Sequence, residues 1–380
     1  MNFITRLFTR VKPLPEATHQ LKAVQDEKPY RLHLRLRGEG GGVLVVNAST
    51  VLHLNPTAAE YAYHFIQGTD PEEAARQVAA RYRVDRKTAL TDYAGFTERI
   101  RALIATPDLD PVSFLDFERV APHSAELGAP LRLDCALTYE LPPGAERDST
   151  PLKRVERELT TEEWQAVLDK AWGAGIPHVT FTGGEPTLRA DLPVLIAHVE
   201  KIGQVCGLLT DGLKLADKEY LHMLLQTGLD HVLLVLQPEN EDSWWAVEAI
   251  LPEDLFLTVH LTITAENLNS APQYLDRLAT TGLQNLSLSS SGASLDGELR
   301  ALRDQAGHLG LNLRWDLPVP YSEANPVTLE TKEDDVPAGA GRAWMYVEPD
   351  GDVLTAQGTA GRVLGNFLRD PWDTIQKQAA

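Results

Sequence analysis

The 380-residue chain contains only two cysteines, Cys135 and Cys206. Two thiols cannot form a disulfide framework, and so few are typical of a reducing compartment, so we expect a cytoplasmic protein. The sequence also lacks a run of about 18 apolar residues, so we expect no membrane-spanning helix. The N-terminus has no continuous apolar core followed by a cleavage site, which argues against a secretory signal peptide.

Positive charge is scarce as well, since 35 lysines and arginines face 54 aspartates and glutamates, a net charge of -19. An acidic surface of this size repels phosphate backbones, so we expect no nucleic-acid partner. Hydrophobic residues make up 43% of the chain, which is enough to build real cores. The length predicts two or three domains.

Residues 1–29 are expected to be a tail and a linker. Apolar residues and arginines mix over Met1–Lys12, which leaves two interpretations open. The segment is either a short amphipathic helix that docks on a partner or an anionic surface, or a loosely ordered tail. Prolines and scattered charges over residues 13–29 favour a linker.

Residues 30–105 have the pattern of a small winged-helix-like domain. Alternating or continuous apolar runs predict three strands: Arg31–Arg37, Val43–Val46 and Val51–Leu54. Asn55-Pro56 is a typical helix start, an N-cap followed by proline. Two more short helices are expected after Asp70 and over residues 86–105, followed by a linker over residues 106–130.

Residues 131–317 alternate six times between a strand-like and a helix-like pattern. The predicted strands are Leu131–Thr138, Pro177–Thr182, Gln204–Leu209, Asp230–Leu236, Leu255–Ile263 and Gln284–Ser289. This order predicts an α/β fold with parallel strands, a (βα)6 partial TIM barrel. Functional residues of such a barrel lie on the loops after the C-terminal ends of the strands.

Residues 318–380 should form a small C-terminal β-hairpin extension. Two short strand-like runs flank Pro349-Asp350-Gly351-Asp352, an Asp-Gly turn. A short final helix is expected near Trp372.

Two strand ends carry candidate cofactor-binding loops. After the second strand, two glycines allow close approach of a ligand to the backbone, and a glutamate adds a carboxylate. That glutamate is either a ligand to an amine or a surface carboxylate at a helix N-terminus. The candidate cofactor-binding residues of the two loops are Gly183, Gly184, Glu185, Pro186, Thr210, Asp211 and Gly212.

Gly183–Pro186, in this strand-loop-helix context, resembles the motif with which radical S-adenosylmethionine (SAM) enzymes contact the amino group of the SAM methionine. Thr210–Gly212 resembles the Thr-Asn-Gly of that family, and Leu137–Tyr139 resembles the lead-in to its cluster loop. The resemblance implies three cysteines, spaced C-x3-C-x2-C, that bind a [4Fe–4S] cluster. The corresponding positions hold Leu141, Ala145 and Asp148.

These three residues cannot replace the cysteines, because iron–sulfur clusters need several thiolates on one loop. Leucine and alanine have no ligating atom, and one aspartate offers only hard oxygen donors. Cys135 and Cys206 fall inside predicted strands, where each is most simply a small buried hydrophobe. We therefore predict no iron–sulfur cluster, no other metal site and no catalytic residue, whereas residual SAM binding stays open.

Both flanking regions extend the resemblance. Trp344–Val353 with Gly365-Asn366 resembles a SPASM-type extension, which binds auxiliary clusters in many relatives, but no cysteine follows Cys206. Residues 30–105 resemble the PqqD-like peptide-recognition domain, judged from Leu54–Ala58 and the acidic helix starts. In that family the domain captures the leader of a precursor peptide as an added strand. The implied peptide-binding residues are Val43, Leu44, Val45 and Leu54.

The histidines and tryptophans of the barrel leave alternatives open. His178, His231 and His260 are expected to be hydrogen-bonded sheet residues rather than ligands. Trp244 and Trp245 either pack against the barrel or line a peptide groove.

Three functions fit these observations. The main hypothesis is a non-catalytic accessory protein that binds a precursor peptide, an active radical SAM partner enzyme, or both, in ribosomal peptide maturation. The second is an enzyme of changed chemistry that uses SAM or a metal with carboxylates at the barrel mouth, although the sequence shows no nucleophile–base pair. The third is a structural or regulatory subunit that pairs barrel to barrel with a paralogue. The carboxylates of the second hypothesis are Glu140, Asp148, Glu185 and Asp211.

Overall fold

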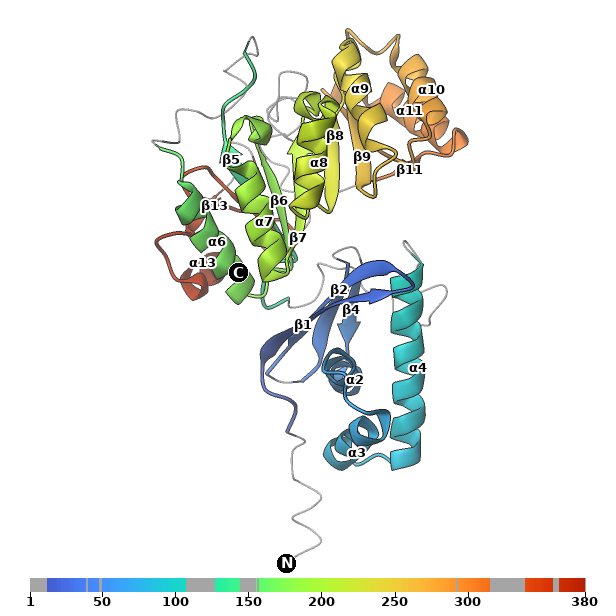
Figure 1. The fold of residues 1–380 in the computed structure, drawn as a ribbon, viewed down its shortest axis with the longest axis vertical. Helices are drawn as coiled ribbons and strands as arrows, with labels where there is room; N and C mark the ends of the chain where they lie inside the picture. The colour runs from blue at the N-terminus through green and yellow to red at the C-terminus, as the bar shows by residue number, and fades with distance from the viewer. Residues whose placement is uncertain are drawn as a thin grey trace, which may run out of the picture. The chain divides into compact units, whose positions relative to one another are not determined.

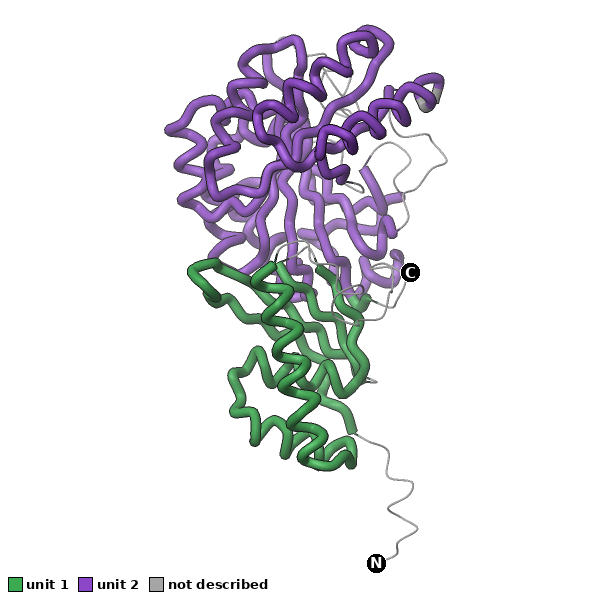
Figure 2. The backbone as a smooth tube through the Cα atoms, turned by 90° about the vertical axis from the view of Figure 1, so that its right-hand side faces the viewer, with its two compact units in different colours: residues 1–128 green, residues 129–380 purple. Residues whose placement is uncertain are grey.

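The computed structural model of the chain describes residues 12–38, 40–47, 50–106, 127–143, 155, 157–291, 293–314, 339–357 and 362–379. Two compact units divide the chain, Met1–Gly128 and Ala129–Ala380 (Figure 2). Among the described residues, no helix is both long and apolar enough to cross a bilayer.

In its described residues, unit 1 combines a four-stranded antiparallel sheet, in the order β1-β2-β3-β4, with three helices (Figure 1). The strands are β1 (Ala17–Gln25), β2 (Lys28–Leu36), β3 (Gly42–Val46) and β4 (Thr50–Leu54). The helices are α2 (Pro56–Ile66), α3 (Pro71–Tyr82) and α4 (Arg86–Ala105). Asn55 caps α2 through a hydrogen bond from the Ala58 amide, which confirms the predicted helix start. The third helix, α4, has the bounds predicted from the sequence, residues 86–105.

Strand β1 occupies a stretch where the sequence predicts a linker, so that prediction is wrong. It pairs with β2 along its whole length, and Leu21 lies opposite Leu32. The tight turn between them places Asp26 and Glu27 at positive φ, as two-residue hairpin loops require. On its helix-facing side β1 presents small and polar residues as well as leucine, and this mixture hides the strand periodicity.

Unit 2 is built on one ten-stranded sheet in the order β11-β10-β9-β8-β7-β6-β5-β12-β13-β14. The strands of the barrel are β5 (Arg132–Thr138), β6 (His178–Gly183), β7 (Val205–Thr210), β8 (His231–Val235), β9 (Phe256–Ile263), β10 (Asn285–Ser290) and β11 (Asn312–Leu313). Its helices are α6 (Thr161–Gly173), α7 (Leu192–Ile202), α8 (Lys218–Gln226), α9 (Glu241–Ile250), α10 (Ala271–Thr281) and α11 (Asp296–His308). All neighbouring pairs from β5 to β11 are parallel, which confirms the predicted partial barrel.

The C-terminal extension continues the barrel sheet. Its elements are β12 (Trp344–Val347), β13 (Asp352–Leu354), β14 (Val363–Asn366) and α13 (Trp372–Ala379). β12 and β13 form the predicted antiparallel hairpin. β12 also runs parallel to β5, with Met345 opposite Leu133, so the extension is joined to the barrel by backbone hydrogen bonds.

Alternate residues of the barrel strands face two different environments. One set packs with the helices in a single apolar core, which includes both cysteines. Cys135 and Cys206 are fully buried there, which confirms the prediction that they are buried hydrophobes. Burial raises the pKa of the Cys135 thiol well above its ordinary value, which disfavours the thiolate that metal binding needs. The other set, on the inner face, is largely polar.

Candidate functional site

The mouth of the barrel is shaped by a close approach between residues 138–140, at the end of β5, and Gly183 and Gly184, at the end of β6. A Cβ on Gly183 would lie 2.0 Å from the Thr138 carbonyl oxygen, and one on Gly184 would lie 2.1 Å from that of Glu140. The amides of Gly184 and Glu185 donate to these same carbonyls over 2.7 and 2.8 Å. Both glycines are therefore required by the protein's own packing, whatever else they bind.

Glu185 is buried at the centre of this mouth rather than exposed at a helix end. It precedes the short 3-10 turn η3 (Pro186–Leu188) and is 3% exposed. Its Oε1 accepts hydrogen bonds from the Thr187 amide (2.9 Å), the Thr187 hydroxyl (2.5 Å) and the Thr210 hydroxyl (2.8 Å). Its Oε2 accepts one from the Asp211 amide (2.8 Å). The carboxylate thus joins the end of β6 to the end of β7.

Glu185 and Asp211 form a pair of buried carboxyl groups. Burial, reinforced by the negative charge of Asp211, raises the pKa of Glu185 to about 8. Burial also raises the pKa of Asp211, whose Oδ1 accepts a hydrogen bond from the Leu213 amide. Two adjacent carboxyl groups cannot both ionise cheaply, so near neutral pH the pair retains a proton.

Two hydroxyl groups near the mouth are buried and have no hydrogen-bond partner in the described part of the chain, those of Thr182 and Tyr220. Burial and the charge of Glu185 raise the pKa of Tyr220 to about 12. Lys214 donates to the Thr187 carbonyl (2.7 Å) and lies 5.2 Å from the centroid of the Tyr220 ring. This lysine ties the loop after β7 to η3.

The loop expected to carry a cluster begins in the described part of the chain and leaves it after Pro143. Leu141 is partly buried, whereas Ala145 and Asp148 lie outside the described residues. Just before the loop, the Tyr139 hydroxyl donates to Glu348 Oε1 (2.8 Å), and the Tyr346 hydroxyl lies 3.3 Å from that of Tyr139. This buried cluster holds the start of the loop against the C-terminal extension.

Over the described residues, no three His, Cys, Asp or Glu side chains come together as a metal site. Of the four mouth carboxylates proposed from the sequence, the structure brings together Glu185 and Asp211. The Glu140 side chain is exposed, and Asp148 is not described.

The residues implied in peptide binding lie in the core of unit 1. Val43, Leu44 and Val45 belong to β3, which is paired with β2 on one side and β4 on the other. They are at most 2% exposed, and Leu54 of β4 is 3% exposed. A peptide strand cannot pair with β3, so of these four residues only Leu54 lies on a strand with a free edge.

Two of the three barrel histidines meet on the inner face. Nε2 of His178 in β6 lies 2.7 Å from Nε2 of His231 in β8. Gly207 of the strand between them makes room, because a Cβ there would lie 2.1 Å from the His231 ring. Burial, followed by the charge of Arg132, lowers the pKa of His231 to about 4. Both rings are hydrogen-bonded sheet residues, as the sequence predicts.

His260 of β9 has hydroxyl groups on both sides of its ring. Its Nδ1 lies 3.0 Å from Ser287 Oγ, and its Nε2 lies 3.1 Å from Ser289 Oγ. Neither serine was predicted as a functional residue from the sequence. The available signal was their period-two spacing in a strand whose other face is apolar. The parallel register of β9 and β10 then places Ser287 opposite His260.

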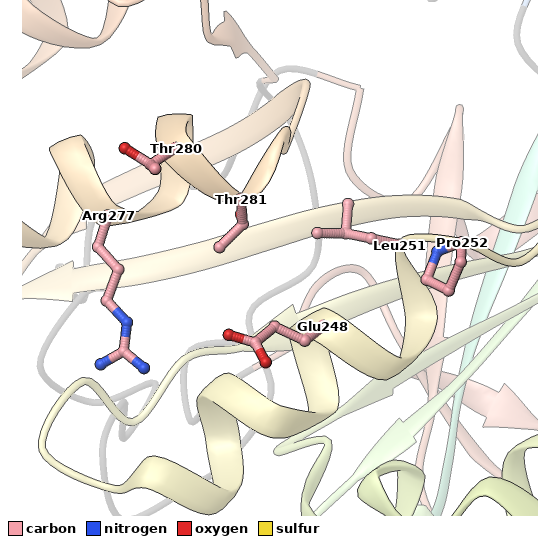
Figure 3. Close-up of a pocket in the computed structure, with 6 residues that line it drawn as sticks. All are labelled: Glu248, Leu251, Pro252, Arg277, Thr280 and Thr281. Carbon is pink, nitrogen blue, oxygen red and sulfur yellow. The ribbon is translucent and has the colours of Figure 1, made fainter.

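The outer surface of the barrel has a separate hollow between α9 and α10 (Figure 3). Its lining residues are Glu248, Leu251, Pro252, Arg277, Thr280 and Thr281. Nearby, Trp244 is fully buried and stacks on Arg277 at 3.9 Å, whereas Trp245 is 57% exposed. The packing interpretation is therefore confirmed for Trp244, and Trp245 faces solvent.

Similarity to known proteins shows the family to which the chain belongs. The family model of the radical SAM superfamily matches residues 143–256. The PqqA peptide cyclase of Streptomyces rochei is 31% identical over 283 residues, which cover 66% of this chain and 76% of the relative. The chain belongs to the radical SAM superfamily. A second PqqA peptide cyclase, from Bradyrhizobium diazoefficiens, is 29% identical over 60% of this chain and 66% of its own length.

Solved structures of the radical SAM superfamily share the fold. Streptococcus suis SuiB, solved with bound S-adenosylmethionine, matches with a TM-score of 0.58 over 94% of this chain and 88% of its own, at 14% identity. SuiB has also been solved with its precursor peptide SuiA. The enzyme anSMEcpe, with SAM and a peptide, matches with a TM-score of 0.50 over 65% of this chain and 80% of its own, at 12% identity. At these identities the likeness confirms the fold class alone.

Membership of the radical SAM superfamily normally implies SAM and an iron–sulfur cluster. The donor set of this chain does not fit the cluster, because both of its cysteines are buried in the helix-side core on separate strands. Four iron atoms need several thiolates within reach of one another. No step of a reaction is therefore assigned to a cluster in this protein.

Proposed function

We propose that this protein binds a precursor peptide, and through it serves an active radical SAM enzyme, during maturation of a ribosomally made peptide. It performs no radical chemistry itself. The observation that carries the proposal is the pairing of a complete unit 1 with a barrel that lacks cluster ligands. The PqqA peptide cyclases and the SuiB–SuiA complex support it, since both act on or bind a peptide.

The peptide would add as a strand to the free edge of β4. Among the described strands, β4 lies at the edge of the sheet and pairs only with β3, and an edge strand is where a peptide adds as a further strand. Thr50, Val51 and His53 of β4 are partly exposed, so side-chain contacts with a peptide can accompany the backbone pairing. The other edge strand, β1, is the alternative site that an experiment must distinguish.

SAM is expected to bind weakly or not at all. The four donors that already bond to Glu185 occupy the carboxylate that would meet the amine of SAM. Without iron, the coordination of the amino acid part of SAM is lost as well, and with it a main anchor.

The test uses the full-length protein and synthetic peptides. The probes are synthetic PqqA peptides of Streptomyces rochei and Bradyrhizobium diazoefficiens, titrated by fluorescence anisotropy. We expect micromolar binding by at least one probe. Hydrogen exchange should then slow over residues 50–54 on binding and stay unchanged over residues 17–25.

Absence of binding by every probe at 100-fold the expected range, about 10⁻⁴ M, would overturn the proposal. Protection confined to residues 17–25 would overturn the choice of β4 and leave peptide binding intact.

A second candidate function, a subunit that docks on a partner enzyme, is favoured by Trp245. A tryptophan that is 57% exposed on α9 is the kind of residue that anchors protein interfaces. If this candidate is right, Trp245→Ala should weaken co-elution with a radical SAM enzyme encoded beside the gene, while Val194→Ala, on the exposed face of α7, should not. Equal co-elution of both variants would count against it.

A further inference from the structure

The inner face of β9 and β10 carries polar residues at every second position. The residues between them point to the helix-side core and are leucines, a valine and an isoleucine. The inner residues are Thr258, His260, Thr262, Asn285, Ser287 and Ser289. Such a row is expensive to bury unless it is hydrogen-bonded, so its geometry decides what it can do.

Three of these residues have the spacing of a nucleophile, a base and an orienting group. Ser289 Oγ lies 3.1 Å from His260 Nε2, within the range for transfer of a hydroxyl proton. The opposite ring nitrogen lies 3.0 Å from Ser287 Oγ. A proton on Nδ1 donated to Ser287 leaves the lone pair of Nε2 to accept from a hydroxyl group, which is the tautomer a general base needs. Two hydroxyl groups face this nitrogen, that of Ser289 at 3.1 Å and that of Thr262 at 3.3 Å, and Ser289 is the nearer.

The residues that would act as base and orienting group are more deeply buried than the residue that would act as nucleophile. His260 is 2% exposed and Ser287 is 8% exposed, so the ring is held firmly between strands. Ser289 is only partly buried and stands next to the last residue of β10. In barrels of parallel strands, reacting groups stand at this C-terminal end.

We propose that Ser289 is a nucleophile activated by His260, and that the site transfers acyl groups from esters or activated amides of peptide-like substrates. Ser287 is a positioning residue, since it acts through the imidazole. This activity needs neither a cluster nor SAM, and it does not depend on the proposed peptide binding by unit 1.

The step is balanced without any further cofactor. The Ser289 hydroxyl proton moves to His260 Nε2 as Oγ bonds to the acyl carbon. The imidazolium then gives this proton to the departing alcohol or amine as the bond to it breaks. Water, deprotonated by the same imidazole, releases the acid and regenerates the serine. Since Ser287 is neutral, it stabilises the imidazolium less than a carboxylate would, so turnover should be slow.

A fluorophosphonate probe tests the nucleophile directly. Serine attacks its phosphorus, fluoride leaves, and the stable adduct is located by peptide mass spectrometry. On the full-length wild-type protein we expect a single adduct at Ser289. Ser289→Ala should abolish it, and His260→Gln should slow its formation by about 10²-fold. Ser287→Ala should slow it less, and Ser290→Ala, on the neighbouring residue of the opposite face, should leave it unchanged.

Three results would overturn the proposal. The first is the absence of an adduct at Ser289 in the wild-type protein while its circular dichroism shows a folded state. The second is an adduct that forms equally fast in His260→Gln, because the serine would then not be activated by that ring. The third is labelling that is lost in Ser290→Ala but kept in Ser289→Ala, because the reacting residue would then be Ser290.

Discussion

The edge of unit 1 and the mouth of the barrel differ in what their polar groups already bind. Along β4, the backbone groups of the outer edge are not used by another described strand. At the barrel mouth, the Glu185 carboxylate accepts four hydrogen bonds from its own protein, and the backbone at the end of β5 occupies the space beside the two glycines.

This difference explains how peptide binding could be kept while cluster-dependent chemistry is lost. A strand edge can bind a peptide as long as the sheet is folded, because the backbone supplies the hydrogen-bond donors and acceptors. A cluster site is lost when three side chains change. The barrel itself survives such a loss, because the apolar burial that stabilises it lies in the helix-side core between strands and helices.

Restoring the thiolates should give the largest change. The triple variant Leu141→Cys, Ala145→Cys, Asp148→Cys should acquire about four irons and four sulfides per chain on anaerobic reconstitution, since only the ligands are missing. Iron and sulfide assays check it. Failure of the triple variant to bind iron would mean that the mouth has changed in more than its ligands. A triple serine variant is the matched control.

Removing the Glu185 carboxylate should destabilise the barrel next most strongly. Glu185→Ala leaves four buried donors without an acceptor, which should lower the free energy of unfolding of unit 2 by about 3 kcal/mol. Urea unfolding followed by tryptophan fluorescence measures this. Glu241→Ala, which removes an exposed ion pair with Arg277, should have no measurable effect. If both variants unfold alike, Glu185 is not a structural acceptor.

Stability should also depend on pH through Glu185. Its pKa of about 8 in the folded protein exceeds its ordinary value of 4.5, so the folded state binds more protons than the unfolded state between these values. The free energy of unfolding should therefore fall as pH rises from about 5 to about 8 and level off above that. Thermal unfolding of the wild type and Glu185→Gln checks this. The variant should show a shallower slope, and an unchanged slope would refute the assignment.

The smallest effect concerns the cysteines. Because both are fully buried, neither should react with Ellman's reagent in the native protein, and both should react in urea. Rapid modification of Cys135 or Cys206 without unfolding would show that a thiol is accessible after all, and would reopen the question of metal binding.

The sequence predicted the barrel closely because its signals are local. Each of the six predicted strands has its own apolar run, and its boundaries lie within two residues of the observed ones, as for Asp230–Leu236 against His231–Val235. The two-residue strand β11 (Asn312–Leu313) was not predicted. Strand β1 was missed because Ala17, His19 and Ala23 do not form an apolar stripe that marks a buried face.

The site was predicted less well because its properties depend on distant contacts. The sequence identified Glu185 and Asp211 but not that Thr187 and Thr210 would saturate the carboxylate of Glu185. Likewise, the link between His260 and Ser289 arises from the pairing of two strands 29 residues apart in the chain. The contacts of Thr210 and Ser289 depend on which residues of neighbouring strands lie side by side. No local sequence pattern contains this information.

The central claim is that this radical SAM protein carries no cluster. The most direct measurement is iron and acid-labile sulfide in the full-length protein after anaerobic incubation with excess iron and sulfide, followed by desalting. We expect the protein to retain no more iron and no more sulfide than a protein without cysteines retains under the same treatment. About four irons and four sulfides per chain, with micromolar SAM binding in the same sample, would contradict it.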